Sequence, residues 1–162
     1  ELTRVCGDGP LTPDHLADLT VHDMVLKEAM RLYPPVPAMY RVAKQDVTLG
    51  DVALGKGDIL SIAIYPMHRN SRLWEAPHSF DPGRFAPDKV EAHRRFQFIP
   101  FSGGARICIG MKFSLMEAIA ILAQVIRHVE LGPHPDTAPY PKSRITLRPE
   151  GGMPLAIRPR SA

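Results

Sequence analysis

Phe101-Ser-Gly-Gly-Ala-Arg-Ile-Cys-Ile-Gly110 places a single cysteine, Cys108, between a glycine-containing loop and a long apolar segment. Apolar residues recur in that segment at the spacing of one helix face, at Leu115, Met116, Ile119, Leu122, Ala123 and Ile126. Free amide N–H groups and the helix dipole favour negative charge at the start of a helix, which favours the thiolate form of Cys108. Gly103 and Gly104 remove side-chain bulk, and Arg106 supplies a cation nearby. Together these residues indicate an anionic cofactor that is held through sulfur.

The composition is that of one globular domain with a hydrophobic core. The chain has 162 residues, 44% of them hydrophobic, and 20 Lys+Arg against 17 Asp+Glu leave a formal charge of +3. This weak charge argues against a nucleic-acid partner. Two cysteines do not make a disulfide framework, and no apolar run reaches the ~20 residues that span a bilayer. We therefore expect a reducing, cytoplasmic location, while the start at Glu1 leaves open an upstream segment and a membrane anchor within it.

The first third of the chain predicts two helices. Thr12-Pro13 is typical of the start of a short helix, and Thr20-Val-His-Asp23 resembles a capping box for a helix over residues 21–33. Pro34-Pro35 would end that helix. The apolar face contains Val21, Met24, Val25 and Leu32, and it also carries two opposite charges, Glu28 and Arg31. Charges on a buried face must be paired. The alternative is an ordinary surface pair at i, i+3.

Short strands and a long irregular segment follow the prolines. We expect strands at residues 39–42, 47–49, 52–54 and 58–65, with the last of them the most buried. Residues 66–100 show little periodicity, but the aromatic residues among them favour a packed, functional segment. Residues 145–147 and 155–157 predict a final hairpin around Glu150-Gly-Gly-Met153.

Three motifs in this order resemble the cytochrome P-450 superfamily. Phe101-x-x-Gly104-x-Arg106-x-Cys108-x-Gly110 is similar to its haem-binding signature, and Glu28-x-x-Arg31 is similar to its helix K motif. Phe80-Asp-Pro82-Gly-Arg84-Phe85 is similar to its aromatic-proline-arginine motif, with Gly83 where members usually have Glu. The resemblance covers about residue 11 to the C-terminus. It implies an α+β, mainly helical fold, the C-terminal part of the family's fold: helix K, a small β-sheet, a meander, the cysteine loop, helix L and a terminal β-hairpin.

The resemblance also implies roles for individual residues. Cys108 would be the axial thiolate ligand of the haem iron, with the amides of Ile109 and Gly110 directed at its sulfur. The other implied haem-binding residues are Phe101, Gly104, Arg106 and Arg41, of which the two arginines match propionate-binding positions. The implied structural network is Glu28, Arg31 and Arg84, which we expect to be mutually hydrogen-bonded and largely buried. The implied substrate contacts are Val36, Pro37, Ala38, Met39, Gly152 and Met153.

The implied activity is that of a haem-thiolate monooxygenase. Such an enzyme uses haem b, O₂ and electrons from a reductase or ferredoxin to insert one oxygen atom into a lipophilic substrate. Arg94, Arg95 and Lys112 would attract an acidic electron donor to the proximal face, or they are simply a solvated surface. The family's oxygen-activating helix has no counterpart in residues 1–162. We therefore expect this chain to be a haem-binding portion that is inactive alone and that pairs with the missing segment or another copy.

Other interpretations of the same residues remain open. The chain could be a non-catalytic haem-binding or interaction module. Cys108 could be a catalytic nucleophile with a histidine partner, but no local signature of a cysteine protease surrounds it. No second cysteine or Cys/His cluster near it supports zinc. His68 is expected to make structural hydrogen bonds, and five histidines are expected at the surface: His15, His22, His93, His128 and His134.

Overall fold

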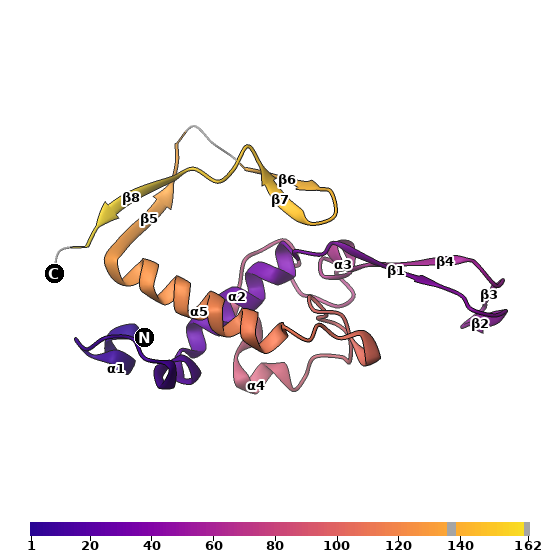
Figure 1. The fold of residues 1–162 in the computed structure, drawn as a ribbon, viewed down its shortest axis with the longest axis horizontal. Helices are drawn as coiled ribbons and strands as arrows, with labels where there is room; N and C mark the ends of the chain where they lie inside the picture. The colour runs from indigo at the N-terminus through magenta and orange to yellow at the C-terminus, as the bar shows by residue number, and fades with distance from the viewer. Residues whose placement is uncertain (136–138, 161–162) are drawn as a thin grey trace.

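The computed structural model describes residues 1–135 and 139–160. Figure 1 shows two helices, α2 (Thr20–Leu32) and α5 (Met111–His128), which cross in the body of the molecule. A narrow β arm extends from this body on one side, and a second group of strands lies above α5. Of the described residues, no helix is both long enough and apolar enough to cross a bilayer.

The N-terminal segment folds against the start of α2. Helix α1 (Leu2–Cys6) is followed by the 3₁₀ helix η1 (Pro13–Asp18), which begins at Thr12-Pro13 as the sequence predicted. The predicted capping box at Thr20 is wrong, because Thr20 already lies inside α2 and makes no side-chain cap. The carboxylate of Glu1 takes that place and accepts hydrogen bonds from the amides of Val21 (2.8 Å) and His22 (3.3 Å).

His22 is buried, contrary to the surface position that the sequence predicted. Its residue exposure is 5%, and its Nδ1 lies 2.7 Å from Glu1 Oε2. These hydrogen bonds hold the pKa of Glu1 below its ordinary value against the opposing effect of burial. The unexpected burial of His22 follows from α1, which folds back over this end of α2.

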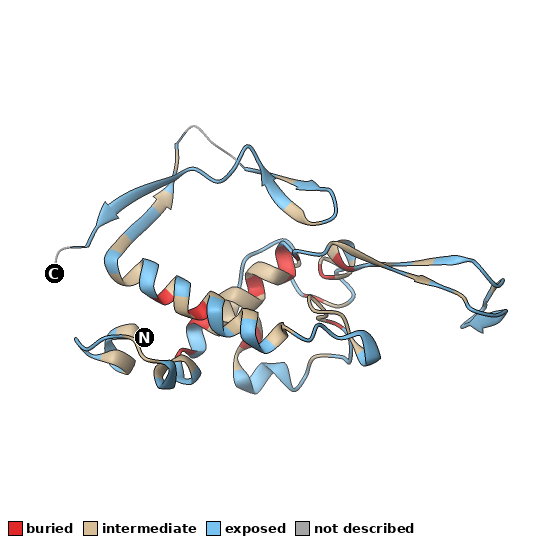
Figure 2. Ribbon diagram, in the orientation of Figure 1, coloured by how far each residue is buried: buried red, intermediate tan, exposed pale blue. Residues whose placement is uncertain are grey.

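The hydrophobic core lies between η1, α2 and α5. Leu19, Ile119 and Ala123 are its buried centre, and five partly buried residues pack around them: Leu2, Val5, Leu11, Leu16 and Leu26. Figure 2 shows that buried residues gather at this crossing and in the adjoining segment, which includes the short helix at residues 64–67. The predicted apolar face of α2 is wrong at Val21, which is 50% exposed, because the α1 segment covers the His22 side instead.

The β arm consists of two antiparallel pairs. Strand β1 (Ala38–Val42) pairs with β4 (Ile59–Ala63), and β2 (Val47–Leu49) pairs with β3 (Val52–Leu54) at the tip. The prediction that the last strand is the most buried is wrong: Ile59 is 71% exposed, because the two-stranded arm has no layer packed on it. The strand also ends early, since Ile64, which is fully buried, begins helix α3 (Ile64–Met67).

The long segment after α3 is packed, as its aromatic content predicted. It contains the 3₁₀ helix η2 (Pro82–Phe85) and the short helix α4 (Pro87–Val90). Trp74 and Phe85 are each 3% exposed, and their ring centroids lie 5.9 Å apart. His93 lies edge-on to both rings at 5.2 and 5.5 Å, so its predicted surface position is wrong, and partial burial lowers its pKa.

The predicted final hairpin is wrong in its pairing. Strand β7 (Leu147–Glu150) pairs with β6 (Tyr140–Ser143), and β8 (Leu155–Pro159) pairs with β5 (Val129–Pro133). Gly151 and Gly152 have φ of +75° and +88°, a region that favours glycine, and they lead the chain away from β7 instead of back along it. The tip of the true hairpin is therefore the loop between β6 and β7.

Candidate functional site

The cysteine loop presents Cys108 at the surface immediately before α5. A short 3₁₀ helix, η3 (Gly104–Arg106), precedes the cysteine, and Gly110 is the N-cap residue of α5. The Cys108 amide donates to the carbonyl oxygen of Phe101 at 2.9 Å, which closes the loop. Gly104 has φ of +67°, which a residue with a side chain adopts only under strain. The closed loop leaves Cys108 exposed, with its thiol free to meet a ligand.

Apolar residues flank Cys108 in the sequence, and their side chains are exposed. Ile107, Ile109 and Phe113 are 50%, 104% and 71% exposed. A Cβ built on Gly110 would lie 3.9 Å from the Cys108 sulfur, so glycine keeps the space beside the sulfur open. Among the described residues no amide is hydrogen bonded to that sulfur, and the implied role of the Ile109 and Gly110 amides stays a prediction. An exposed thiol within an apolar surface matches the donor and the surroundings that a flat apolar cofactor needs.

One cationic cavity is lined by both arginines for which the family resemblance implies propionate binding. Its volume is about 470 Å³, and Arg41 of β1 and Arg106 of η3 both line it. Arg41 Nη1 donates to its neighbour's carbonyl oxygen, that of Tyr40, at 2.9 Å, and Nη2 lies 3.4 Å from Ser102 Oγ. Lys44 also lines the cavity and was not singled out in the sequence, although it lies three residues after Arg41. The lining contains three cations and no carboxylate, which suits a dianionic group.

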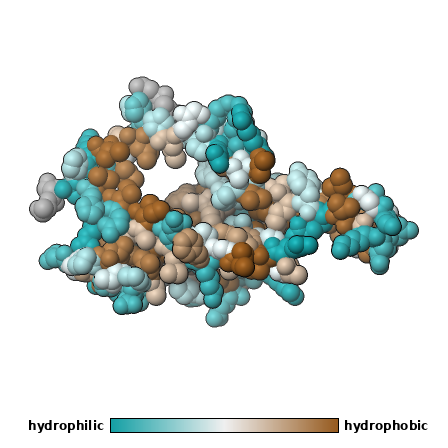
Figure 3. Space-filling view, viewed as in Figure 1, coloured by the Kyte–Doolittle hydropathy of each residue, from teal (hydrophilic) through white to brown (hydrophobic). Residues whose placement is uncertain are grey.

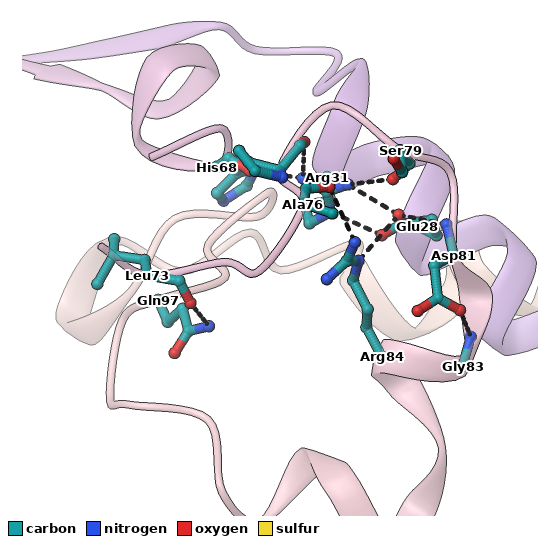
Figure 4. Close-up of polar contacts among 11 residues, drawn as sticks. Glu28, Arg31, His68, Leu73, Ala76, Ser79, Asp81, Gly83, Arg84 and Gln97 are labelled. Carbon is teal, nitrogen blue, oxygen red and sulfur yellow. Dashed lines mark hydrogen bonds and ion pairs between the residues drawn. The ribbon is translucent and has the colours of Figure 1, made fainter. Parts of the chain in front are cut away.

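Glu28 and Arg31 form a fully buried ion pair on α2 (Figure 4), with a side-chain exposure of 0% for both residues. Arg31 Nε and Nη2 donate to the two carboxylate oxygens of Glu28 at 2.7 and 2.8 Å. The remaining guanidinium N–H groups donate to three carbonyl oxygens of the irregular segment, those of His68, Pro77 and Ser79, at 2.7–3.0 Å. All five donors of Arg31 are therefore engaged. The burial and pairing that the sequence predicted for this pair are confirmed.

Arg84 joins this pair differently from the prediction. Its Nε lies 3.4 Å from Glu28 Oε1 but has no hydrogen-bond partner, so the contact is an ion pair rather than the predicted hydrogen bond. The hydrogen bond to Glu28 Oε1 comes instead from the Asp81 amide at 2.8 Å. Arg84 Nη2 donates to the carbonyl oxygen of Ala76 at 3.0 Å. The network thus ties α2 to both ends of the segment that carries Trp74 and Phe85.

The implied substrate contacts lie at two places. Residues 36–39 join α2 to the β arm, and the preceding Pro35 carbonyl accepts a hydrogen bond from the Leu147 amide at 2.9 Å. Met153 lines an apolar cavity of about 380 Å³ against α2, with Met30, Tyr33 and Leu147 among the other lining residues. Ile145, at the tip of the β6–β7 hairpin, is 92% exposed. Sequence reasoning missed this tip, because it assigned residues 145–147 to the wrong hairpin.

Arg94, Arg95 and Lys112, the predicted basic patch, are all exposed. The Arg95 guanidinium carbon lies 4.7 Å from the centroid of the Phe96 ring. Exposure is compatible both with a docking surface for an electron donor and with a solvated face, and the role of these residues stays a prediction.

His68 is fully buried beside the ion pair and titrates far from its ordinary range. Burial, with a contribution from the neighbouring positive charges of Arg31 and Arg69, lowers its pKa from 6.5 to about 4. The unfolded chain therefore binds a proton between pH 6.5 and 4 that the folded chain does not. We expect the free energy of unfolding to fall by about 2–3 kcal/mol as pH drops through this window. Urea melts of the haem-free protein at several pH values measure this loss.

A matched pair of variants tests whether His68 causes this pH dependence of the free energy of unfolding. His68→Gln should remove most of it, and His78→Gln, a change at an exposed histidine, should leave it in place. If the free energy of unfolding of His68→Gln kept the same dependence on pH, other groups, such as His93, would cause the loss of stability.

The comparisons with known proteins agree with these observations. The family profile described as Cytochrome P450 matches residues 1–155. "Cytochrome P450 4A10" of Rattus norvegicus is 41% identical over 160 residues, which are 98% of this chain and 31% of that protein. "Taurochenodeoxycholic 6 alpha-hydroxylase" of Sus scrofa shows the same identity and coverage, and "Cytochrome P450 734A5" of Oryza sativa subsp. japonica is 42% identical over 98% of the chain and 30% of that protein.

A solved structure, "Crystal structure of cytochrome P450DA heme domain", superimposes with a TM-score of 0.91 at 30% identity. The superposition covers 99% of this chain and 36% of the chain in that structure. The chain thus spans about a third of the length of the proteins it resembles. With its cysteine loop and buried ion pair, the chain belongs to the cytochrome P450 family.

Proposed function

We propose that this chain provides the thiolate ligand and the proximal surface of a haem monooxygenase. The observation that supports this most strongly is the exposed Cys108 thiol, held between apolar side chains at the start of α5. When bound, the haem supplies the activation of O₂ and the transfer of one oxygen atom to an organic substrate. Cys108 would hold the haem iron through its thiolate and would supply the negative charge of the ligand.

The other residues of the site hold the cofactor in place. Arg41, Lys44 and Arg106, which line one cavity, would bind the propionates. Ile107, Ile109 and Phe113 are exposed apolar groups that would contact the macrocycle and exclude water from the thiolate. The hydrogen bond from the Cys108 amide to the Phe101 carbonyl oxygen fixes the backbone that carries the sulfur, and the Phe101 side chain would cover the sulfur.

The substrate is a lipophilic molecule that contacts residues 36–39 at the junction of α2 and the β arm. The Leu147 amide ties the β6–β7 hairpin to this junction, so the exposed Ile145 at the hairpin tip is a further contact. The relative from Sus scrofa is named "Taurochenodeoxycholic 6 alpha-hydroxylase", and a hydroxylation is the kind of reaction proposed here. Electrons come from a redox protein that binds Arg94, Arg95 and Lys112.

The oxygen-activating side of the site comes from another segment or chain. Residues 1–162 correspond to about a third of their relatives, and α5 carries an apolar face that nothing among the described residues covers. Figure 3 shows apolar surface over this region, to which Phe113, Met116 and Ile121 contribute at exposures of 51–71%. An exposed apolar face of this kind is typical of a surface that binds another segment or chain. We therefore propose that residues 1–162 alone are catalytically inactive.

The cationic cavity gives a direct test of the cofactor assignment. In the protein that carries this chain, Arg41→Ala combined with Arg106→Ala should weaken haem affinity about tenfold or more, because each arginine–propionate contact contributes on the order of 1 kcal/mol. Haem titration followed in the Soret region measures the affinity. Arg72→Ala removes an exposed arginine from another segment and should change nothing. Equal affinities in the double variant and the control would place the propionates elsewhere, and absence of haem binding in the unmodified protein would overturn the proposed function.

A further inference from the structure

We infer that His68 is a positioning residue for Cys108, which it serves by fixing the backbone that enters the cysteine loop. This inference rests on the proposed function only in taking Cys108 as the haem ligand. The hydrogen bonds that support it belong to the chain itself and can be measured without haem.

The imidazole ring of His68 binds the start of the loop directly. Its Nε2 accepts a hydrogen bond from the Ile99 amide at 3.1 Å, and the ring lies 5.3 Å from the Phe98 ring, centroid to centroid. His68 is 0% exposed, so water cannot replace this bond. A buried amide that loses its acceptor carries the full cost of its desolvation.

Ile99 in turn begins the turn that leads to the cysteine loop. Its carbonyl oxygen accepts from the Ser102 amide at 3.1 Å, and Ser102 has φ of +68°, a strained value for a residue with a side chain. One residue earlier, the carbonyl oxygen of Phe101 accepts from the Cys108 amide at 2.9 Å. Both main-chain polar groups of Ile99 are therefore hydrogen-bonded. The turn that these bonds fix contains the Phe101 carbonyl group, which closes the loop around Cys108.

The other side of His68 is anchored in the buried ion pair. Its carbonyl oxygen accepts from Arg31 Nη1 at 2.8 Å, and Figure 4 shows His68 beside Arg31. The Arg31 guanidinium is itself held by both oxygens of Glu28. His68 thus links the buried pair of Glu28 and Arg31 to the loop that contains Cys108. Among the implied network residues, Glu28, Arg31 and Arg84, none makes a hydrogen bond to residues 99–110.

The ring must be neutral to accept the Ile99 N–H at Nε2. Burial among the cations Arg31 and Arg69 favours the neutral form at physiological pH. The geometry and the protonation state are therefore consistent with one role, that of a fixed hydrogen-bond acceptor.

Hydrogen exchange of the haem-free protein tests this role. His68→Leu keeps the buried volume and removes the acceptor, whereas His68→Gln offers a side-chain oxygen to the same amide. We expect amide exchange in residues 99–110 to accelerate roughly tenfold or more in His68→Leu and to return close to the wild-type rate in His68→Gln. The control is Ile64→Ala, which empties a fully buried site in the same α3 turn but leaves the Ile99 hydrogen bond intact.

The spectrum of the haem-loaded protein supplies the second measurement. His68→Leu should convert part of the thiolate-type Soret band of the reduced CO complex to the band of a protonated or displaced thiol, and Ile64→Ala should not. Exchange in residues 99–110 that is no faster in His68→Leu than in Ile64→Ala, or that is equally fast in His68→Gln, would overturn the inference. A wild-type protein without the thiolate band would overturn the proposed function instead, and the exchange rates would still decide whether His68 holds the loop.

Discussion

Replacing Cys108 with alanine is expected to abolish the strongly red-shifted Soret band of the reduced, CO-bound protein. That band depends on a thiolate bound to the iron, and Cys108 is the exposed cysteine of the loop at the start of α5. Oxygenase activity should be lost with it, because no other group at this position can supply the negative charge. The measurement is the absorption spectrum of the protein that carries this chain, loaded with haem, reduced and exposed to CO.

Cys6→Ala is the matched control for this experiment. Cys6 is the only other cysteine in the sequence; it closes α1 and is partly buried. Its replacement should leave the Soret band unchanged. Cys108→His is a second variant, because a histidine in the same place can retain haem while it changes the band, which separates loss of the ligand from loss of the cofactor. Persistence of the thiolate band in both Cys108 variants would contradict the assignment of the ligand.

The parts of the site that the sequence predicted are those with strong local signals. A glycine-containing loop before a long apolar helix defines where Cys108 lies, and the helix over Met111–His128 follows from its own periodicity. The opposite charges of Glu28 and Arg31, three residues apart on the apolar face of α2, likewise predicted a buried pair. In each of these cases the residues that decide the structure are close together in the chain.

The parts that the sequence missed depend on residues far apart in the chain. Glu1 caps α2 from outside the helix, so a local capping box at Thr20 was the wrong prediction. The strand of residues 155–159 pairs with residues 129–133 across an intervening hairpin, which alternation of residue types cannot indicate. The structural hydrogen bonds predicted for His68 are confirmed, but their partners were not predictable, because Arg31 and Ile99 lie far from it on opposite sides in the sequence.

Glu28→Ala is expected to lower the free energy of unfolding by roughly 3–5 kcal/mol, the range for breaking a buried ion pair by removing one partner. Glu28 is 0% exposed, and its carboxylate compensates the positive charges of two arginines. Its oxygens lie 2.7 Å from Arg31 Nε and 3.4 Å from Arg84 Nε. Alanine would leave two cations without a counter-charge, and it would also remove the acceptor of the Asp81 amide. Because these contacts hold the segment that leads to the cysteine loop, haem retention should fall together with stability. Urea melts of the haem-free protein measure the first effect.

A partly exposed ion pair on the same helix provides the control. Lys27 Nζ lies 2.6 Å from Asp23 Oδ2 at the i, i+4 spacing, with side chains 30% and 28% exposed. Asp23→Ala should cost less than about 1 kcal/mol, because solvent screens a pair of this kind. The two variants remove the same chemical group from the same helix and differ mainly in burial. If Glu28→Ala cost no more than Asp23→Ala, then Arg31 and Arg84 would keep their positions without a counter-charge. The carbonyl oxygens of residues 68, 77 and 79 would then be sufficient to hold the guanidinium of Arg31 in the folded protein.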